Sequence, residues 1–292
     1  MRMKYISQIQ ASLKRYRTIP TKKVTSRILD GSYRSVYKGK SMNFDELREY
    51  VVGDDRKDID WKASARSQKM LVKQYIAEKK HNIMLVMDTN RRMLADTKEL
   101  EPKWETALLS AGTLAYLVNQ NGDYVSAIYS TEHSMEHFPF KMGLMNIENI
   151  LEHYQKNVTM KNRSNIEKTL DYILRNFRRR MILIVVTDLE GIRGISETTL
   201  KRIITLHDIL VIHVNDAEAT GEMVYNMEKE RYLPEFFTGN KKLAKLQKER
   251  QEAVYKECED KLKRFGIAVT TVGHKQEINT KLTSLLQRHQ HV

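Results

Sequence analysis

Cysteine is nearly absent from this chain of 292 residues, and it has no proline-rich linker and no long apolar run. The single cysteine, Cys258, excludes an intramolecular disulfide framework and a cysteine-based zinc site, and it fits a reducing compartment. The longest apolar runs, such as residues 181–186, are far too short to span a bilayer. Because residues 1–17 contain no continuous apolar core, we expect no signal peptide and predict a cytoplasmic protein.

Several motifs of enzymes are missing as well. The stretch 191–194 has two glycines but lacks the lysine and the Ser or Thr that a phosphate-binding loop requires after them. No serine lies in a G-x-S-x-G nucleophile elbow. Nine histidines are scattered without metal-ligand spacing. What remains, 41% hydrophobic and 30% charged residues, is the composition of a globular protein.

Positive charge is in excess, with a formal net charge of +13, and it is concentrated near the N-terminus. Residues 1–40 contain eleven lysines and arginines and one acid, Asp30. A basic arm of this kind can contact nucleic acid, an anionic membrane surface or an acidic partner, or it can simply be solvated. Within it, residues 3–17 have apolar side chains at helical spacing, which predicts an amphipathic helix that docks on the body of the protein.

From residue 80 onward, short apolar runs alternate with stretches of helical period. The expected strands are residues 83–88, 124–130, 181–188, 208–216 and 267–273. The expected helices are residues 104–118, 166–177, 200–207, 243–265 and 278–286. This alternation predicts an α/β fold with a doubly wound, mostly parallel sheet, to which residues 134–139 add an antiparallel edge strand. Residues 20–80 do not show this alternation and contain one clear strand pattern, at 71–76. We therefore divide the chain into a smaller β-rich N-terminal region, 1–80, and an α/β domain, 81–292.

An aspartate-rich stretch, residues 50–66, first suggests a metal site or a catalytic carboxylate cluster. A calcium loop is excluded, because the sixth and twelfth positions counted from Asp54 are Ile59 and Ala65 instead of glycine and glutamate. Neighbouring cations lower the pKa of carboxyl groups, which favours ion pairs over proton donation. We therefore interpret the stretch as a salt-bridged turn packed around Trp61.

The same stretch resembles the signature of a bacterial domain-of-unknown-function family, the one numbered fifty-eight. The signature residues are Arg48, Tyr50, Gly53, Asp54, Asp55, Asp60, Trp61, Ser64 and Arg66, followed by the L-x-V-K-x-Y-like run at 71–75. One departure is visible, because Arg56 and Lys57 stand where the family has any residue followed by arginine. We expect Asp54, Asp55 and Asp60 to pair with arginines and cap turns, and Trp61 to pack at the junction with the α/β domain.

The resemblance implies that the residues after about 80 form a von Willebrand factor A-like domain. It also implies a partnership with a MoxR-type AAA+ ATPase, whereas the biochemical activity of the family is poorly defined. Domains of this type often hold a divalent cation through a D-x-S-x-S motif, a threonine in a second loop and an aspartate in a third. Oxygen ligands of this kind suit Mg²⁺.

In this chain the matching positions are Asp88, Asn90, Ser164 and Asp188, which form a degenerate version of the metal-site pattern. Asn90 replaces the first serine of the motif, and Arg92 replaces the second. A guanidinium group among aspartates repels a dication and can pair with the carboxylates itself. We therefore expect no cofactor, with Mg²⁺ as the alternative, and hypothesise that Arg91 and Arg92 replace the ion with a fixed positive charge. In a purely structural interpretation, Ser164 opens a capping box with Glu167.

Three functions follow from these features. The first is a non-enzymatic protein-interaction module that acts with a MoxR-type AAA+ ATPase in assembling or remodelling a protein complex. The second is a metal-dependent hydrolase that uses Asp88 and Asp188 together with the aspartates of residues 50–66. The third is a binder of nucleic acid or of an anionic surface, suggested by the net charge and by the three arginines at 178–180, although the chain lacks an aromatic-basic recognition motif.

Overall fold

A computed structural model describes residues 3–16, 43–76, 80–217, 225–226, 231–232 and 241–290. The chain forms two compact units: Met1–Ile28 with His81–Val292, and Leu29–Lys80. Most of the basic arm that the sequence suggests, residues 17–42, lies outside the described residues. Among the described helices, none is long and apolar enough to cross a membrane.

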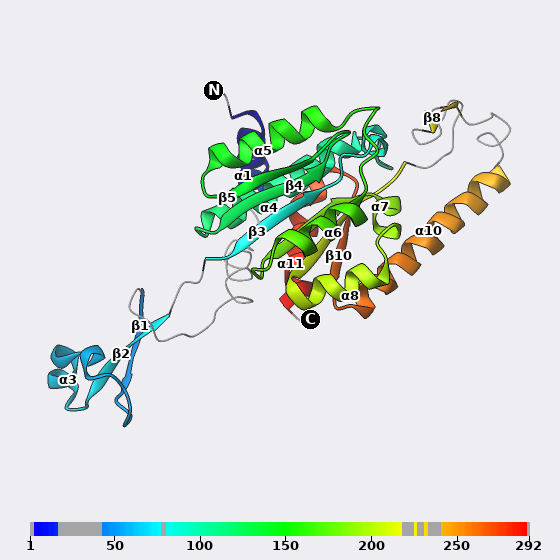
Figure 1. Ribbon diagram of the computed structural model, residues 1–292. Helices are drawn as coiled ribbons and strands as arrows, with labels where there is room; N and C mark the ends of the chain where they lie inside the picture. The colour runs from blue at the N-terminus through cyan, green and yellow to red at the C-terminus, as the bar shows by residue number, and fades with distance from the viewer. Residues whose placement is uncertain are drawn as a thin grey trace. The chain divides into compact units, whose positions relative to one another are not determined.

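The larger unit is built on a six-stranded sheet with the order β10-β7-β6-β3-β4-β5 (Figure 1). Its strands are β3 (Asn82–Met87), β4 (Tyr124–Ser130), β5 (Met135–Lys141), β6 (Ile182–Thr187), β7 (Asp208–Val214) and β10 (Ala268–Val272). All neighbouring pairs are parallel except β4 and β5, which are antiparallel. The predicted doubly wound α/β fold and its antiparallel edge strand are therefore confirmed. The strand order reverses between β3 and β6, and ligands of such sheets bind beyond the strand ends at this switch point.

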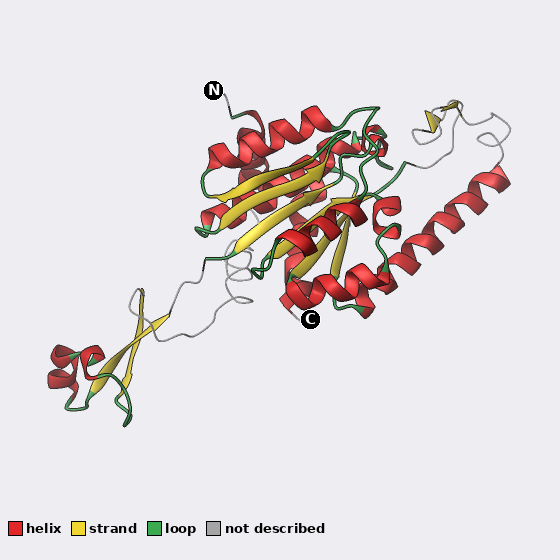
Figure 2. Cartoon of the chain, in the orientation of Figure 1, coloured by secondary structure: helices red, strands yellow, loops and turns green. Residues whose placement is uncertain are grey.

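Helices cover both faces of this sheet, as Figure 2 shows. They are α4 (Lys103–Gln120), α5 (Leu144–Asn157), α6 (Ile166–Asn176), α7 (Leu189–Arg193), α8 (Glu197–Leu206), α10 (Lys241–Arg264) and α11 (Ile278–Gln290). Helices α6, α7, α8 and α10 share one apolar core with the strands, whereas α4, α5 and α11 pack on the other face. The central strands β3 and β6 are buried along almost their whole length, which explains their continuous apolar sequence. Outside the sheet, β8 (Tyr225–Asn226) pairs with β9 (Arg231–Tyr232).

The N-terminal helix α1 (Lys4–Tyr16) packs on α4 and α5, so it belongs to the larger unit. Tyr5, Ile6 and Ile9 are each 1% exposed. The fully buried carboxylate of Glu148, in α5, accepts hydrogen bonds from the backbone N–H groups of Tyr5 (2.9 Å) and Ile6 (2.8 Å). The apolar stripe of α1 is thus buried against two helices that lie about 100 residues or more further along the chain.

The smaller unit contains an antiparallel pair, β1 (Asn43–Glu49) and β2 (Leu71–Ile76). Between them lie the 3₁₀ turn η1 (Arg56–Asp58) and the short helix α3 (Trp61–Ser67). Ile59 and Val72 are buried, at 6% and 4% exposure, and face each other across an antiparallel bridge. Trp61, in contrast, is 67% exposed. The expectation of a turn packed around Trp61 is wrong, because Trp61 is the first residue of α3 and Ile59 takes the buried position.

Candidate functional site at the strand ends

Two buried aspartates mark the switch point of the sheet. Asp88 follows β3 and Asp188 follows β6, the two strands between which the strand order reverses. Both residues are 1% exposed. The backbone N–H of Asp88 donates to the carbonyl of Val186 (3.0 Å), which extends the β3–β6 ladder and brings the two carboxylates together.

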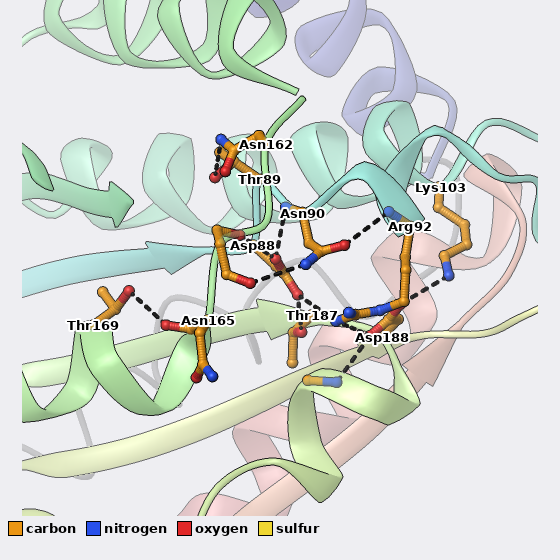
Figure 3. A network of polar contacts seen from close by, with 12 residues as sticks. Asp88, Thr89, Asn90, Arg92, Lys103, Asn162, Asn165, Thr169, Thr187 and Asp188 are labelled. Atoms are coloured by element: carbon orange, nitrogen blue, oxygen red, sulfur yellow. Dashed lines mark hydrogen bonds and ion pairs between the residues drawn. The ribbon is translucent and has the colours of Figure 1, made fainter. Parts of the chain in front are cut away.

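Three donors surround the carboxylate of Asp88 (Figure 3). Its Oδ1 accepts from the backbone N–H of Asn90 and from the hydroxyl of Ser164, both at 2.8 Å. Its Oδ2 accepts from the hydroxyl of Thr187 at 2.6 Å. Burial and the nearby charge of Asp188 raise the pKa of Asp88, although the hydrogen bond from Thr187 opposes the shift. Because every one of these partners is a donor, the arrangement suits a carboxylate.

Cations neutralise the second carboxylate. Asp188 Oδ2 lies 3.0 Å from Nε of Arg92 and 3.1 Å from Nζ of Lys103, and Oδ1 accepts from the backbone N–H of Gly191 at 2.9 Å. The same guanidinium reaches Asp88, with an N–O distance of 3.8 Å. Burial alone would raise the pKa of Asp188, but Lys103 and Arg92 hold the pKa of this carboxyl well below its usual range.

Lys103 is a functional residue that the sequence motifs do not reveal. It is the first residue of α4 and is 1% exposed, and its ammonium group contacts both Asp188 and Asp216. Burial would lower its pKa, but the two aspartates raise the pKa above the ordinary value. The available signal is a lysine in the first turn of a helix, where the helix dipole disfavours a cation unless acidic groups lie nearby.

Asn90 and Arg91 fix the loop that carries Arg92. The side-chain oxygen of Asn90 accepts from the backbone N–H of Arg92 (3.0 Å) and begins the 3₁₀ turn η2 (Arg91–Leu94). The amide group of Asn90 donates to the carbonyl of Ser164 at 2.9 Å. Arg91 is 2% exposed, and its backbone N–H donates to the carbonyl of Asn162. The structure thus brings Asp88, Asn90, Ser164 and Asp188 together in one network, in which the Arg92 side chain contacts the two aspartates.

The capping-box interpretation of Ser164 is wrong. The N-cap of α6 is Asn165, whose side chain accepts from the backbone N–H of Lys168 (3.4 Å), while the hydroxyl of Ser164 is turned to Asp88. Glu167 accepts instead from the N–H and hydroxyl groups of Ser196, at the start of α8. The sequence spacing is that of a capping box, but the buried carboxylate is the stronger acceptor for the Ser164 hydroxyl.

The donor set does not fit a divalent cation. The carboxylate oxygens of Asp88 accept from Asn90, Ser164 and Thr187, and the Asp188 carboxylate is paired with two cations. A dication at this position would be repelled by both cations. In the part of the chain that the structure describes, no cluster of three or more His, Cys, Asp or Glu side chains has the arrangement of a metal site.

Gly191 is required by the same packing, and no sequence motif predicts this role. A Cβ atom added at residue 191 would lie 1.8 Å from Oγ1 of Thr187 and 3.0 Å from Oδ2 of Asp88. Helix α7 therefore approaches the carboxylates closely enough for its backbone N–H to donate to Asp188 only because residue 191 has no side chain.

The signature residues form a separate, local network in the smaller unit. Asp54 pairs with both terminal nitrogens of Arg48, at 2.8 Å and 2.6 Å. Asp55 caps η1 by accepting from the backbone N–H of Lys57. Asp60 caps α3 by accepting from Ala63 N–H (3.0 Å). This hydrogen bond, aided by a lysine of β2, lowers the pKa of Asp60.

The remaining signature residues shape the backbone around this network. Tyr50 N–H donates to the carbonyl of Met70 (2.8 Å), and Ser64 Oγ accepts from Leu71 N–H (2.8 Å). Gly53 has φ of +111°, a conformation that side-chain-bearing residues rarely adopt. Arg66 is exposed in the last turn of α3. The cation that the structure places on Asp60 is Lys73, at 3.5 Å, where an arginine was expected.

Comparison with known protein families decides the relationship. The family described as "Protein of unknown function DUF58" matches residues 46–223, more than half of the chain. The chain belongs to the DUF58 family. Curated relatives include the uncharacterized proteins Mb1516 of Mycobacterium bovis and Rv1480 of Mycobacterium tuberculosis, each 25% identical over 194 residues. The match covers 65% of this chain and about 60% of the length of these relatives.

Solved structures with some similarity come from more distant proteins. They include the conserved hypothetical protein BatB from Bacteroides thetaiotaomicron (16% identity, TM-score 0.47) and an aerotolerance-related membrane protein from Bacteroides fragilis (14%, 0.47), each matched over its full length and over 73% of this chain. A von Willebrand factor type A protein from Catenulispora acidiphila has 10% identity and a TM-score of 0.41, over 75% of this chain and 44% of its own. At such scores, the assignment of this DUF58 chain to the doubly wound α/β class rests on its own strand order.

Proposed function

We propose that this DUF58 protein is a non-enzymatic, cytoplasmic protein-interaction module that acts with a MoxR-type AAA+ ATPase in assembling or remodelling a protein complex. The observation that carries the proposal is the closed state of the strand-end site. Asp88 and Asp188 are buried and bound by hydroxyl, backbone and cationic donors, so neither is available as a nucleophile or a general base. The ATPase partner is suggested by the family resemblance of the signature residues.

A hydrolase is less well supported by the same observations. It would need the aspartates of residues 50–66 as further catalytic groups. Asp54 is paired with Arg48, and Asp60 caps α3, so both carboxylates have structural tasks in their own unit. A role in nucleic-acid binding is weakened at residues 178–180, because the guanidinium group of Arg180 pairs with Asp208 (2.7 Å).

The loops around the closed site offer a surface for docking. Leu100 follows β3 in the loop that leads to α4 and is 79% exposed. Met160 lies between α5 and α6, in the loop whose Asn162 and Ser164 contact Thr89 and Asp88, and is 41% exposed. We name the surface formed by residues 95–102 and 158–165 the strand-end surface. Its exposed apolar side chains suit a protein partner.

The test is a binding assay with the purified MoxR-type ATPase from the same genome. We expect Leu100→Asp and Met160→Asp to weaken binding at least tenfold and to remove any effect of the protein on ATP turnover. Met142→Asp is the matched control, because Met142 is 45% exposed but lies at the other end of the strands. It follows β5, which runs antiparallel to β4 and therefore ends beside the start of β4. If the ATPase neither binds the wild-type protein nor changes its ATP turnover, the proposed partnership is wrong. If all three variants bind the ATPase equally well, the contact does not lie on the strand-end surface.

A further inference from the structure

We infer that Arg92 and Lys103 together supply the charge that a bound divalent cation would supply, so that the strand-end site is complete without a metal ion. The inference goes beyond the proposed function, because it concerns how the site is built and holds whichever partner docks there. It rests on three features: the two cations beside the two buried aspartates, the bridging position of Arg92, and the burial of Lys103.

Two cations face the two buried aspartates. Asp88 and Asp188 are both buried at the ends of β3 and β6 and together carry two negative charges. Buried charges persist only when they are paired. The guanidinium group of Arg92 and the ammonium group of Lys103 carry two positive charges, which is the charge of Mg²⁺ or Mn²⁺. Asp216, the second partner of Lys103, adds a third acidic side chain at the margin of the site, where it is 29% exposed to solvent.

Arg92 occupies a bridging position between the two carboxylates. Its Nε is 3.0 Å from Asp188 Oδ2, and a terminal nitrogen is 3.8 Å from Asp88 Oδ2. Its backbone N–H is held by the side chain of Asn90 (3.0 Å), the residue that also donates to the Ser164 carbonyl. The Arg92 side chain therefore links the loop after β3 to the end of β6, and Asn90 and Asp88 connect this pair to the loop before α6.

Lys103 provides the second charge from the start of α4. Figure 3 shows its ammonium group directed to Asp188 from the start of α4. It is 1% exposed, and a lysine side chain that is almost fully buried is rare unless it is paired. The sequence pattern suggested Arg91 with Arg92 as the substitute for an ion, whereas the structure assigns the place on Asp188 to Lys103.

This arrangement predicts that a metal site appears when the two cations are removed. Oxygen atoms of Asp88, Asp188, Asn90 and Ser164 would then surround the vacated position, and Arg92→Ser adds a hydroxyl group. Such an all-oxygen set suits Mg²⁺ and Mn²⁺. We therefore compare the wild-type protein with Arg92→Ser, Lys103→Met and the double variant, in EDTA and in millimolar MgCl₂ or MnCl₂. Lys161→Met is the control, because Lys161 is an exposed lysine of the neighbouring loop.

The wild-type protein and Lys161→Met should melt at the same temperature in EDTA and in either metal, with no heat of binding in isothermal titration. In EDTA the double variant should melt on the order of 5 °C or more below the wild type, and Mg²⁺ or Mn²⁺ should restore much of this loss. Micromolar binding of either metal to the wild-type protein overturns the inference, as does a double variant that metal does not stabilise. If the double variant does not fold, Arg92→Ser combined with Lys103→Gln takes its place, because glutamine removes the second positive charge and keeps a hydrogen-bond donor beside Asp188. Stabilisation of that variant by Mn²⁺ supports the inference, and no response to metal overturns it.

Discussion

The attachment of α1 to the sheet domain depends on one buried carboxylate. Glu148 is fully buried in α5 and accepts the backbone N–H groups of Tyr5 and Ile6, at 2.9 Å and 2.8 Å. These are two of the four N–H groups that a helix N-terminus leaves without intrahelical partners. The negative charge also complements the positive end of the helix dipole. Glu148→Ala therefore removes two charge-assisted hydrogen bonds and leaves two buried N–H groups without an acceptor in an apolar environment.

The expected loss can be worked out from these contacts. Hydrogen bonds to a charged group contribute about 1.5–3 kcal/mol each, which gives about 3–6 kcal/mol for the pair. The loss has an upper limit, because α1 can detach while the sheet stays folded. That limit is set by the burial of Tyr5, Ile6 and Ile9, at about 1.5–3 kcal/mol for each apolar side chain. We expect Glu148→Ala to cost about 3–5 kcal/mol, expressed first as local opening of α1.

Native-state hydrogen exchange measures this opening directly, and urea unfolding followed by circular dichroism measures the global change. In Glu148→Ala, the amides of α1 should exchange faster by a factor of about a hundred or more, corresponding to about 3 kcal/mol, while those of β3 and β6 change less. Glu152→Ala, one turn further along α5 and only partly buried, is the control and should stay within about 0.5 kcal/mol of the wild type. A cost below about 1 kcal/mol for Glu148→Ala, with unchanged exchange in α1, would refute the reasoning.

Three further predictions concern other parts of the chain. Gly191→Ala should lower the free energy of unfolding by about 2 kcal/mol or more in denaturant titrations, because the added Cβ would displace the Thr187 hydroxyl group from Asp88. A loss of stability below about 0.5 kcal/mol would contradict this packing. Burial lowers the pKa of His213 to about 4, so unfolding takes up a proton between about pH 6.5 and 4, and the free energy of unfolding should fall as the pH falls through this window. His213→Phe should reduce the slope of the free energy of unfolding against pH, and an unchanged slope would argue against a neutral buried imidazole. Ile59→Ala should destabilise the smaller unit by about 2–4 kcal/mol, whereas Trp61→Ala should change its stability by less than about 0.5 kcal/mol. Limited proteolysis of the unit measures both effects, and a larger loss for Trp61→Ala than for Ile59→Ala would show that Trp61 is the packing centre.

The strands and most helices of the larger unit could be predicted because their sequences carry the periodicity of buried elements. Residues 181–186, for example, form a continuous apolar run, and β6 is buried at every position. The positions of Asp88 and Asp188 follow from the same argument, since both end a central strand. Helix α5 escaped prediction, because its sequence mixes polar and apolar residues and its buried Glu148 looks like a surface acid until its partners, more than 140 residues away, are known.

The chemistry of the site could be predicted only in part, for a similar reason. A motif gives the residues of one loop, and Arg92 stands inside the D-x-S-x-S pattern, where its charge is visible in the sequence. Lys103 and Gly191 lie outside any motif, and their roles depend on how α4 and α7 approach the strand ends. Spacing likewise suggested a cap for Ser164, but the buried carboxylate of Asp88, in the loop after β3, accepts its hydroxyl group. Local patterns cannot show such competition between distant partners.

The closed site has a consequence for how a partner can recognise this edge of the sheet. If Asp88 and Asp188 are satisfied internally, specificity has to come from the surrounding loops. Leu100 is held there at a φ of +59°, a conformation that costs a residue with a side chain about 1–2 kcal/mol, and it is nevertheless 79% exposed. The loop is tied down by Thr97 and by Asn215, whose side chain accepts from the Lys98 N–H at 3.1 Å. Glycine would fit this backbone better, so stability does not account for a leucine at this position. An exposed apolar side chain on a loop held in place is suited to a docking contact, so the proposed interaction is best tested at the strand-end surface.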